Sequence, residues 1–448
     1  MATEDLIIVA IELGSSQVTG IAGKKMPDGS ICVQALIQEP SSQFIRRGMV
    51  FNLAKSAQCI SMIRERLEDR LKKKISQVYV GYGGQGIHSV FNKLTRNFEH
   101  EIPLSEDVLK EMEEENLLST RSTHTILDVV PQQYIVSKEI SSDPIGVLTD
   151  SIEAQFMNIV ARPSLKANIE NCFNEAGLHV AGCMIVPVSE ARAILTDSEK
   201  RSGCVLVDFG ADTTSVVIFK DNVLRYVSVI PLGSANITKD IASCNLDEKE
   251  AEQLKLTIGN AINTVETHEE GKESVYQFLD GSSLTKMEFS QIVEARMREI
   301  LINVANQIRE SQLDKNMLLG GAVLTGGGSN LKGLIKAFIK ATDISQVRVA
   351  KCLSNVTFSK AIALKVPENR LNGATSILNE ATQNCCGQDF SEMEHPADIF
   401  SQTQEKPKPI EETVQVKEPE VPKEEKKKGM KNFFSKLKVI VEKTVGED

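Results

Sequence analysis

The chain has 448 residues, of which 41% are hydrophobic and 25% are charged, and its formal net charge is −10 at pH 7. Single cores stop growing near roughly 250 to 300 residues, so this length predicts two or three domains. The negative charge argues against a general nucleic-acid binder, and nine cysteines without a C-x-x-C pair argue against zinc and disulfides and for reduced thiols in the cytosol.

The N-terminus is acidic, whereas a signal peptide needs basic residues before its apolar stretch. No apolar run approaches the ~20 residues needed to span a bilayer. Any membrane contact is therefore expected to be peripheral.

The first 80 residues predict a β-β-α-β opening. Strand-like runs occupy Leu6 to Ala10 and Ser30 to Leu36, and the first ends in a turn at Gly14. Helical spacing of apolar residues between Ala54 and Lys74 predicts a helix, which a strand at Val78 to Val80 follows.

The following segments predict a small α+β unit and a return to the first domain. An acidic helix is predicted from Pro103 to Ser119, with strand signals after it. A helix from Lys166 to Gly177, a strand containing Val180, and a single helix from near Ser189 to just before Gly203 follow.

A second copy of the opening pattern begins at Cys204. CVLVDFGADTTSVVIFKDNVLRYVSVI repeats the strand, glycine turn, strand and hairpin of VAIELGSSQVTGIAG, which starts at Val9. A helical region follows from Leu246 to Ser311, and a strand at Ala322 to Thr325 runs into three glycines. The duplication predicts two related lobes.

Three glycine turns follow predicted strands: ELGSS from Glu12, DFGADTT from Asp208 and TGGGSN from Thr325. Glycine lets a backbone approach a phosphate closely, and exposed N–H groups and hydroxyls supply donors. The carboxylates of Glu12 and Asp208 would repel phosphate unless Mg²⁺ lies between. One such turn is more often an ordinary hairpin, but the repeated context favours a phosphate site.

Other motifs do not support catalysis or a dinucleotide site. The stretch from Gly81 to Gly86 fits G-x-G-x-x-G, but Ile87 to Phe98 lacks the helical periodicity that this fingerprint requires. The six histidines are dispersed, so no catalytic triad can be assigned. Cys385 and Cys386 are interpreted as a flexible thiol pair, with palmitoylation as the alternative.

Five segments resemble motifs of the FtsA family in the actin superfamily. They are VYVGYGGQGIHS from Val78, VVPQQYIVSKEISSDPIGV from Val129, AILTDSEKRSGCVLVDFGADTTS from Ala193, EAEQLKLTIGNA from Glu250 and VLTGGGSNLKGL from Val323. The resemblance covers about Leu6 to Leu378 and the tail. It implies an α/β, two-lobed actin-like fold of the duplicated ribonuclease H-like type, with a small inserted α+β domain, a disordered linker and a C-terminal amphipathic helix.

The resemblance also implies the domain boundaries. They are 1–81, 163–202 and 362–382 for the first-lobe core, 82–162 for the inserted domain, 203–244 and 311–361 for the second-lobe core, 245–310 for its outer subdomain, 383–427 for the linker and 428–445 for the terminal helix.

By the same resemblance, ATP and Mg²⁺ are expected between the lobes. The residues expected at the nucleotide are Gly14, Ser15, Ser16, Gln17, Asp208, Gly210, Thr213, Thr214, Gly326, Gly327, Gly328 and Ser329, with Glu252 and Lys255 at the adenosine and ribose. Glu12 and Asp208 are expected to hold Mg²⁺ through water.

The chain departs from the superfamily pattern at three positions. Glu12 replaces the usual Asp, Gln17 stands where a lysine would reach the phosphates, and Asp212 stands where glycine is usual. Losing a cation and adding a carboxylate weaken phosphate stabilisation. No catalytic residue is assigned, and ATP binding with at most weak hydrolysis is expected.

The tail predicts an interfacial helix after a Pro-rich linker that cannot bury enough apolar surface to fold. At 100° per residue, one stripe collects Met430, Phe433, Phe434, Leu437, Ile440 and Val441, with basic residues including Lys431 and Lys438 beside or opposite it. The alternatives are a helix that docks on the lobes and a calmodulin-like target segment.

The resemblance implies a cell-division protein that polymerises at the cytoplasmic face of the inner membrane, at the division site. It implies binding of anionic lipid, of the acidic C-terminal peptide of the tubulin-like protein FtsZ, and of later division proteins. Arg296 and Arg298 are the cations expected to contact that peptide. The alternatives are an actin-superfamily small-molecule kinase and an actin-like pilus-assembly binding module.

Overall fold

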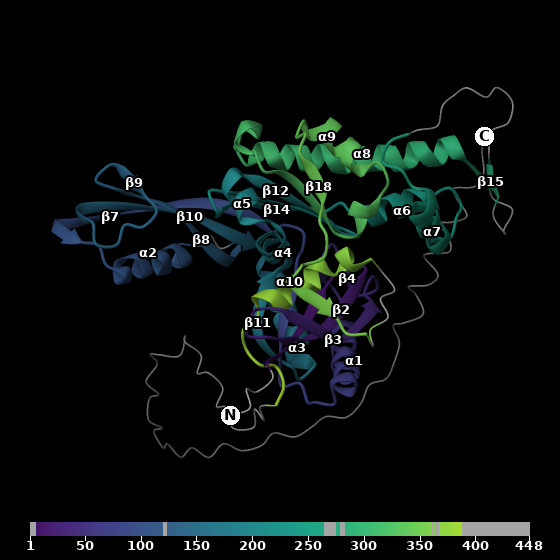
Figure 1. Ribbon diagram of the computed structural model, residues 1–448, viewed down its shortest axis with the longest axis horizontal. Helices are drawn as coiled ribbons and strands as arrows, with labels where there is room; N and C mark the ends of the chain where they lie inside the picture. The colour runs from purple at the N-terminus through teal and green to yellow at the C-terminus, as the bar shows by residue number, and fades with distance from the viewer. Residues whose placement is uncertain are drawn as a thin grey trace, which may run out of the picture. The chain divides into compact units, whose positions relative to one another are not determined.

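The computed structural model describes residues 6–119, 123–263, 275–277, 283–360, 362 and 367–387 (Figure 1). The predicted linker beyond residue 387 and the predicted terminal helix at 428–445 lie outside these residues. In the described part of the chain, no helix combines the length and apolar character needed to cross a bilayer.

The first lobe is built on a six-stranded sheet. Its order is β11-β6-β1-β2-β3-β19, with bounds β1 Leu6–Leu13, β2 Gln17–Lys25, β3 Ile31–Pro40, β6 Gln77–Tyr82, β11 His179–Ile185 and β19 Val356–Phe358. β1, β2 and β3 form an antiparallel meander, and β6 runs parallel to β1. Ile7 to Ile11 are all buried, as expected for a strand in the middle of a covered sheet.

Four helices accompany this sheet: α1 Leu53–Leu71, α3 Pro163–Glu175, α4 Val186–Ile194 and α10 Asn372–Glu380. The helix predicted at Ala54 to Lys74 is therefore α1, and it buries Ile60, Ile63 and Leu67 on one face. The single helix predicted from Ser189 to Gly203 is wrong. Pro187 lies in the first turn of α4, and Thr196 caps a separate helix, α5 Asp197–Ser202.

The second lobe repeats the first. Its core strands are β12 Cys204–Phe209, β13 Thr214–Lys220, β14 Val223–Ile230, β17 Gly321–Thr325 and β18 Val347–Val349, in the order β18-β17-β12-β13-β14. This order matches β11-β6-β1-β2-β3, and β17 runs parallel to β12 as β6 does to β1. The predicted duplication is confirmed, and with it the two-lobed actin-like fold.

The other elements of the second lobe are mainly helices. They are α6 Ser234–Ala242, α7 Glu248–Ile258, α8 Lys286–Glu310, α9 Leu334–Thr342, the short strands β15 Val275–Gln277 and β16 Ser283–Thr285, and the 3₁₀ turns η1 Lys315–Met317 and η2 Gly327–Asn330. Figure 1 shows α8 and α9 together on one side of the strands β12, β14 and β18.

A small α+β unit is inserted between β6 and α3. It comprises β7 His88–Pro103, α2 Glu106–Leu118, β8 Thr125–Val136, β9 Glu139–Ser141 and β10 Leu148–Ala161. Since β7 is a strand, the dinucleotide fingerprint at Gly81 to Gly86 lacks its helix, as the sequence indicated. The unit's sheet also continues the second-lobe sheet, because β7 pairs with β14 and the Ser89 hydroxyl bonds the backbone of Val227.

The remaining short elements are β4 Ile45–Arg46, β5 Met49–Val50 and η3 Glu368–Leu371.

The interpretation of Cys385 and Cys386 as a flexible pair is wrong. Both are buried, and the backbone of Cys385 bonds to Ile7 and Ser76. The first lobe therefore continues to the end of the described chain.

Candidate functional site

A cavity of about 490 Å³ lies between the two lobes, within the size range of small-molecule sites. Most residues predicted to bind nucleotide line it. They are Glu12, Gly14, Ser15, Ser16, Gln17, Asp208, Gly210, Thr213, Glu252, Lys255, Gly326, Gly327 and Gly328. Three turns that are distant in sequence thus meet at one cavity.

The first turn joins β1 to β2. The Gly14 amide donates to the carbonyl of Gln17 at 3.1 Å, and a β-carbon on Gly14 would lie 2.6 Å from that oxygen. The Ser41 hydroxyl donates to the Gly14 carbonyl, and the Ser15 hydroxyl accepts from the Gly48 amide. Surrounding residues therefore fix this turn before any ligand binds.

The second turn joins β12 to β13 and is bonded to the start of α6. The Gly210 carbonyl accepts from both the amide and the hydroxyl of Ser234, and the Ala211 carbonyl accepts from the Ala235 amide. A β-carbon on Gly233 would lie 2.3 Å from the Ala211 oxygen. Glycine there lets α6 begin directly behind the turn.

The third turn follows β17 and requires glycine. Gly326 has a φ of +80° and a ψ of 171°, a backbone region open essentially to glycine alone. A β-carbon there would lie 2.1 Å from an Asp208 carboxylate oxygen. The turn and the Asp208 side chain therefore occupy adjoining space.

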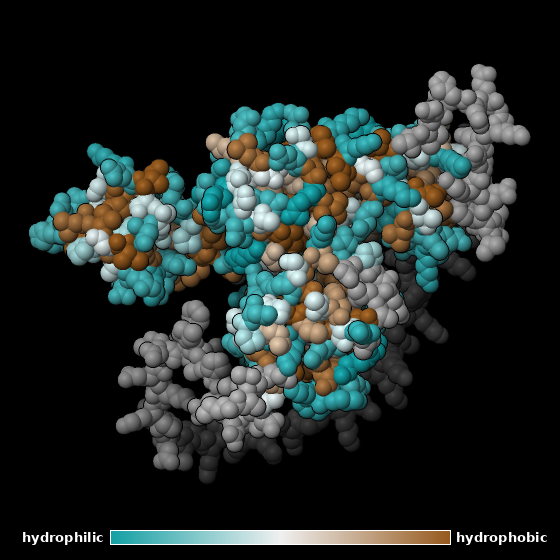
Figure 2. Space-filling view, in the orientation of Figure 1, coloured by the Kyte–Doolittle hydropathy of each residue, from teal (hydrophilic) through white to brown (hydrophobic). Residues whose placement is uncertain are grey.

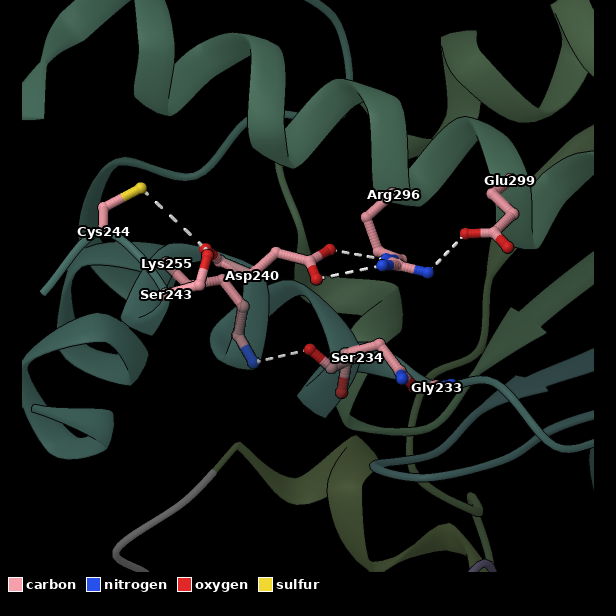
Figure 3. A network of polar contacts seen from close by, with 9 residues as sticks. Gly233, Ser234, Asp240, Ser243, Cys244, Lys255, Arg296 and Glu299 are labelled. Carbon is pink, nitrogen blue, oxygen red and sulfur yellow. Dashed lines mark hydrogen bonds and ion pairs between the residues drawn. The ribbon is translucent and has the colours of Figure 1, made fainter. Parts of the chain in front are cut away.

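Lys255 of α7 also lines the cavity. It is 6% exposed, and its Nζ donates to the Ser234 carbonyl, the Thr238 hydroxyl and the Glu252 carboxylate. Figure 3 shows the side chain reaching from α7 toward Ser234. Burial lowers the pKa of Lys255, and its ion pair with Glu252 opposes that shift. These bonds tie α7 to the start of α6, directly behind the second turn.

Three carboxyl groups line the cavity where the first two turns meet: Glu12 and Asp208, which are partly buried, and Glu190, which is buried. Burial, aided by the charge of Asp208, raises the pKa of Glu12 to about 7, and burial raises that of Asp208 to about 6. The third is Glu190 of α4, whose pKa is raised by burial and by the charges of Asp208 and Glu12. Sequence reasoning missed Glu190.

The position of Glu12 explains why a glutamate fits there. Its carboxylate accepts a hydrogen bond from the amide of Ala374, in the first turn of α10. A β-carbon on Gly373 would lie 2.4 Å from a Glu12 carboxylate oxygen. The longer side chain therefore reaches the N-terminus of α10, and Gly373 provides the space.

These acids fit a hydrated cation better than a directly coordinated one. In the described ranges, no three His, Cys, Asp or Glu side chains are arranged to hold a metal ion. Mg²⁺ usually keeps several waters and takes one or two carboxylates together with substrate phosphates. The residues present are compatible with that mode of binding.

Three residues that were expected to affect nucleotide binding do not line the cavity. The buried Thr214 hydroxyl donates to the Leu232 carbonyl, and the buried Ser329 hydroxyl donates to the Gly326 carbonyl. Asp212 instead accepts from the Arg47 amide and lies 3.7 Å from the ammonium of Lys239. The partners of its carboxylate thus lie outside the cavity lining, as does Asp212 itself.

Arg370 of η3 was also missed. It lines the cavity, and a β-carbon on Gly327 would lie 3.2 Å from its Nε. The guanidinium thus lies over the third turn. The sequence gives little indication of this role, because Arg370 follows the turn by more than 40 residues and belongs to no recognisable motif.

The two predicted partner residues differ in their surroundings. Arg296 of α8 forms a two-pronged ion pair with Asp240 of α6, at 2.5 and 2.9 Å, and also pairs with Glu299 (Figure 3). Arg298 is exposed on the same helix. Arg296 therefore joins two helices of the second lobe, and Arg298 faces solvent.

Comparison with known proteins identifies the family. The family model "Cell division protein FtsA" matches residues 205–363. The cell division protein FtsA of Porphyromonas gingivalis is 31% identical over 347 residues, covering 76% of this chain and 72% of that protein. This chain belongs to the FtsA family. FtsA of Escherichia coli is 26% identical over 410 residues, covering 85% of this chain and 95% of that protein.

A solved structure supports the fold independently of the FtsA match. The chain resembles one described as "PilM-PilN type IV pilus biogenesis complex", with a TM-score of 0.57 and 18% identity, covering 83% of this chain and 96% of that one. At this identity the likeness concerns the fold alone. Because the chain belongs to the FtsA family, we retain neither alternative considered from the sequence, the small-molecule kinase or the pilus-assembly module.

Proposed function

We propose that this FtsA-family chain binds ATP with Mg²⁺, polymerises when nucleotide is bound, and anchors FtsZ to the cytoplasmic face of the inner membrane. The observation that carries the proposal is the convergence of three glycine turns from two duplicated lobes on one cavity. A ligand that contacts all three turns holds the lobes together, so its binding can change their relative arrangement.

The cavity residues divide between the two ends of such a ligand. Backbone amides and hydroxyls of the first two turns would receive the phosphates, and Glu12 and Asp208 would hold Mg²⁺ through water. Glu252 and Lys255 would meet the adenosine and ribose. Arg370 supplies a cation at the third turn, whereas Gln17 supplies none at the first.

This arrangement supports binding better than turnover. Hydrolysis requires stabilisation of charge that develops on the phosphates, and Gln17 offers no cation for it. The chain is accordingly proposed to be at most a weak ATPase, with a rate below the ~1 to 10³ s⁻¹ of typical enzymes.

Membrane attachment is proposed for the basic, aromatic stripe of 428–445. Each aliphatic or Phe side chain contributes at most ~1.5 to 3 kcal/mol on full burial, and ordering the tail opposes insertion. One tail should therefore bind anionic lipid reversibly. A polymer presents many tails, and avidity can rise by roughly 10² to 10⁴.

Partner binding is proposed at two surfaces. The FtsZ C-terminal peptide, which is acidic, would meet α8 near Arg298. Later division proteins would meet the inserted unit, on which Figure 2 shows hydrophobic side chains at the surface. Among the described residues of this unit, the most exposed large hydrophobic side chains are Phe91, Leu118, Ile140 and Leu148.

The test is to measure ATP affinity by calorimetric titration with Mg²⁺ and to measure sedimentation of the full chain with and without ATP. Saturable binding and nucleotide-dependent sedimentation are expected. No detectable ATP binding, or equal sedimentation in both conditions, would contradict the proposal.

A further inference from the structure

Glu190 places a third carboxyl group beside the two that were predicted to hold Mg²⁺. It lies on α4, which follows β11, and the first two residues of α4, Val186 and Pro187, also line the cavity. Glu190 is 3% exposed and lines the cavity with Glu12 and Asp208. The acid therefore reaches the cavity from a third element, separate from the β1 and β12 turns.

One oxygen of the Glu190 carboxyl group has no hydrogen-bond partner. Its Oε2 atom is buried without a hydrogen bond, and no ion pair to Glu190 occurs in the part of the chain that the structure describes. The adjacent Ser189 hydroxyl donates instead to Glu380 of α10. A buried carboxyl oxygen without a partner is unfavourable, and a ligand in the adjoining cavity would supply one.

The charges around Glu190 favour a cation as that partner. Asp208 and Glu12 both repel a charged Glu190. Among the described residues, no Lys or Arg forms an ion pair with any of the three acids. The buried Lys255 is already bonded to Glu252.

We propose that Glu190 is a third carboxylate for the nucleotide's divalent cation, acting through the cation's waters, and that it makes nucleotide binding depend on that cation. The assignment rests on the proposed binding of ATP with Mg²⁺. Contact through water follows from the absence of a direct metal-binding cluster among the described residues. Without a cation, three acids face the nucleotide's phosphates, whereas the waters of a hydrated cation would donate hydrogen bonds to the carboxylates.

The experiment compares ATP affinity with Mg²⁺ and with EDTA for three forms of the full chain. These are the unmodified chain, Glu190→Gln, and the control Glu380→Gln, which neutralises a partly buried acid outside the cavity lining. The ratio of the two dissociation constants reports cation dependence directly. Electron paramagnetic resonance of Mn²⁺ with ADP reports cation affinity without requiring turnover.

Glu190→Gln should bring the two ATP affinities closer together and weaken Mn²⁺ binding by about 10- to 100-fold, as removal of groups that orient a metal's ligands does. Glu380→Gln should change neither value. Glu190→Met, of similar length and without charge, repeats the test should the Gln variant not fold.

An unchanged affinity ratio and unchanged Mn²⁺ binding in a folded Glu190 variant would overturn the assignment and leave ATP binding intact. Failure of the unmodified chain to bind ATP with Mg²⁺ would overturn the proposed function itself, and this assignment with it.

Discussion

The carboxylate of Asp212, in the turn between β12 and β13, accepts a hydrogen bond of 3.1 Å from the backbone amide of Arg47, between β4 and β5. The bond joins the two lobes at the edge of the cavity. The sequence indicated that Asp212 would weaken phosphate binding. In the structure, this acid helps to hold the two lobes together.

Replacing Asp212 with Ala should speed nucleotide release. A hydrogen bond to a charged group near solvent contributes about 1 kcal/mol, which corresponds to about fivefold in rate if the bond is lost as the cleft opens. Stopped-flow release of a fluorescent ATP analogue measures this. Asp197→Ala, an exposed acid that does not line the cavity, is the control. Slower or unchanged release would show that the bond does not restrain the cleft.

Adjacent glycines of the third turn should respond differently to alanine. Gly326→Ala introduces a β-carbon 2.1 Å from the Asp208 carboxylate at a positive φ, so ATP binding should be lost. Gly327→Ala meets only the Arg370 guanidinium, at 3.2 Å, and should bind nearly normally. Titration with ATP distinguishes them, with melting temperature as the folding control. Equal affinities would remove the third turn from the site.

Aspartate at Gly327 or at Gly210 should affect ATP binding through its charge as well as its size. Gly327→Asp places a carboxylate beside Arg370 and so cancels the cation at this turn, whereas Gly210→Asp also crowds the Thr213 carbonyl, 2.8 Å from a β-carbon. Both substitutions should weaken ATP binding, Gly210→Asp more strongly. The reverse order would indicate that Arg370 dominates the site.

Nucleotide-free protein in EDTA should lose stability as pH rises from about 4.5 to 7. The folded-state pKa of Glu12, about 7, exceeds its ordinary value of 4.5, so the unfolded chain releases this proton first. The folded state is thus favoured at low pH. On the order of 3 kcal/mol of this stability is lost as the pH rises from about 4.5 to 7. Melting temperature against pH should fall less steeply for Glu12→Gln. An identical slope of melting temperature against pH in the two proteins would contradict a raised pKa for Glu12.

Arg296 and Arg298 should separate stability from partner binding. Arg296→Ala breaks the pair with Asp240 and should lower the free energy of unfolding by roughly 1 to 3 kcal/mol. Arg298→Glu should leave stability unchanged and weaken binding of an acidic FtsZ C-terminal peptide at physiological salt. Denaturant unfolding and fluorescence anisotropy measure the two effects. Unchanged peptide binding in the Arg298 variant would move the surface elsewhere.

Much of the fold was predictable because it depends on short, repeated patterns. The apolar runs that become β1 and β12, each followed by a glycine turn, indicated the duplication and hence the two lobes. Similarly, the absence of helical spacing after Gly86 excluded a dinucleotide site before β7 was known to be a strand. These features could be predicted because the spacing of apolar residues within a segment depends on the helix or strand that the segment itself forms.

The missed features depend on packing between distant segments. Glu190 and Arg370 reach the cavity only because α4 and η3 lie against the turns of other elements. The Cys385 backbone bonds to Ile7, 378 residues earlier in the chain, so its burial could not be inferred from the polar segment around it. The pairing of β7 with β14 through Ser89 likewise has no local signal.

The proposed link between FtsZ and the membrane can be measured by co-sedimentation of FtsZ with anionic liposomes in the presence of the chain, ATP and Mg²⁺. Phe433→Glu with Phe434→Glu places two charges on the apolar stripe, whereas Asn432→Glu with Ser435→Glu places two charges off it at 100° per residue. We expect that FtsZ pellets with liposomes for the unmodified chain and the control pair, and stays in solution for the stripe pair. Equal pelleting of FtsZ with both pairs, or no pelleting with the unmodified chain, would contradict it.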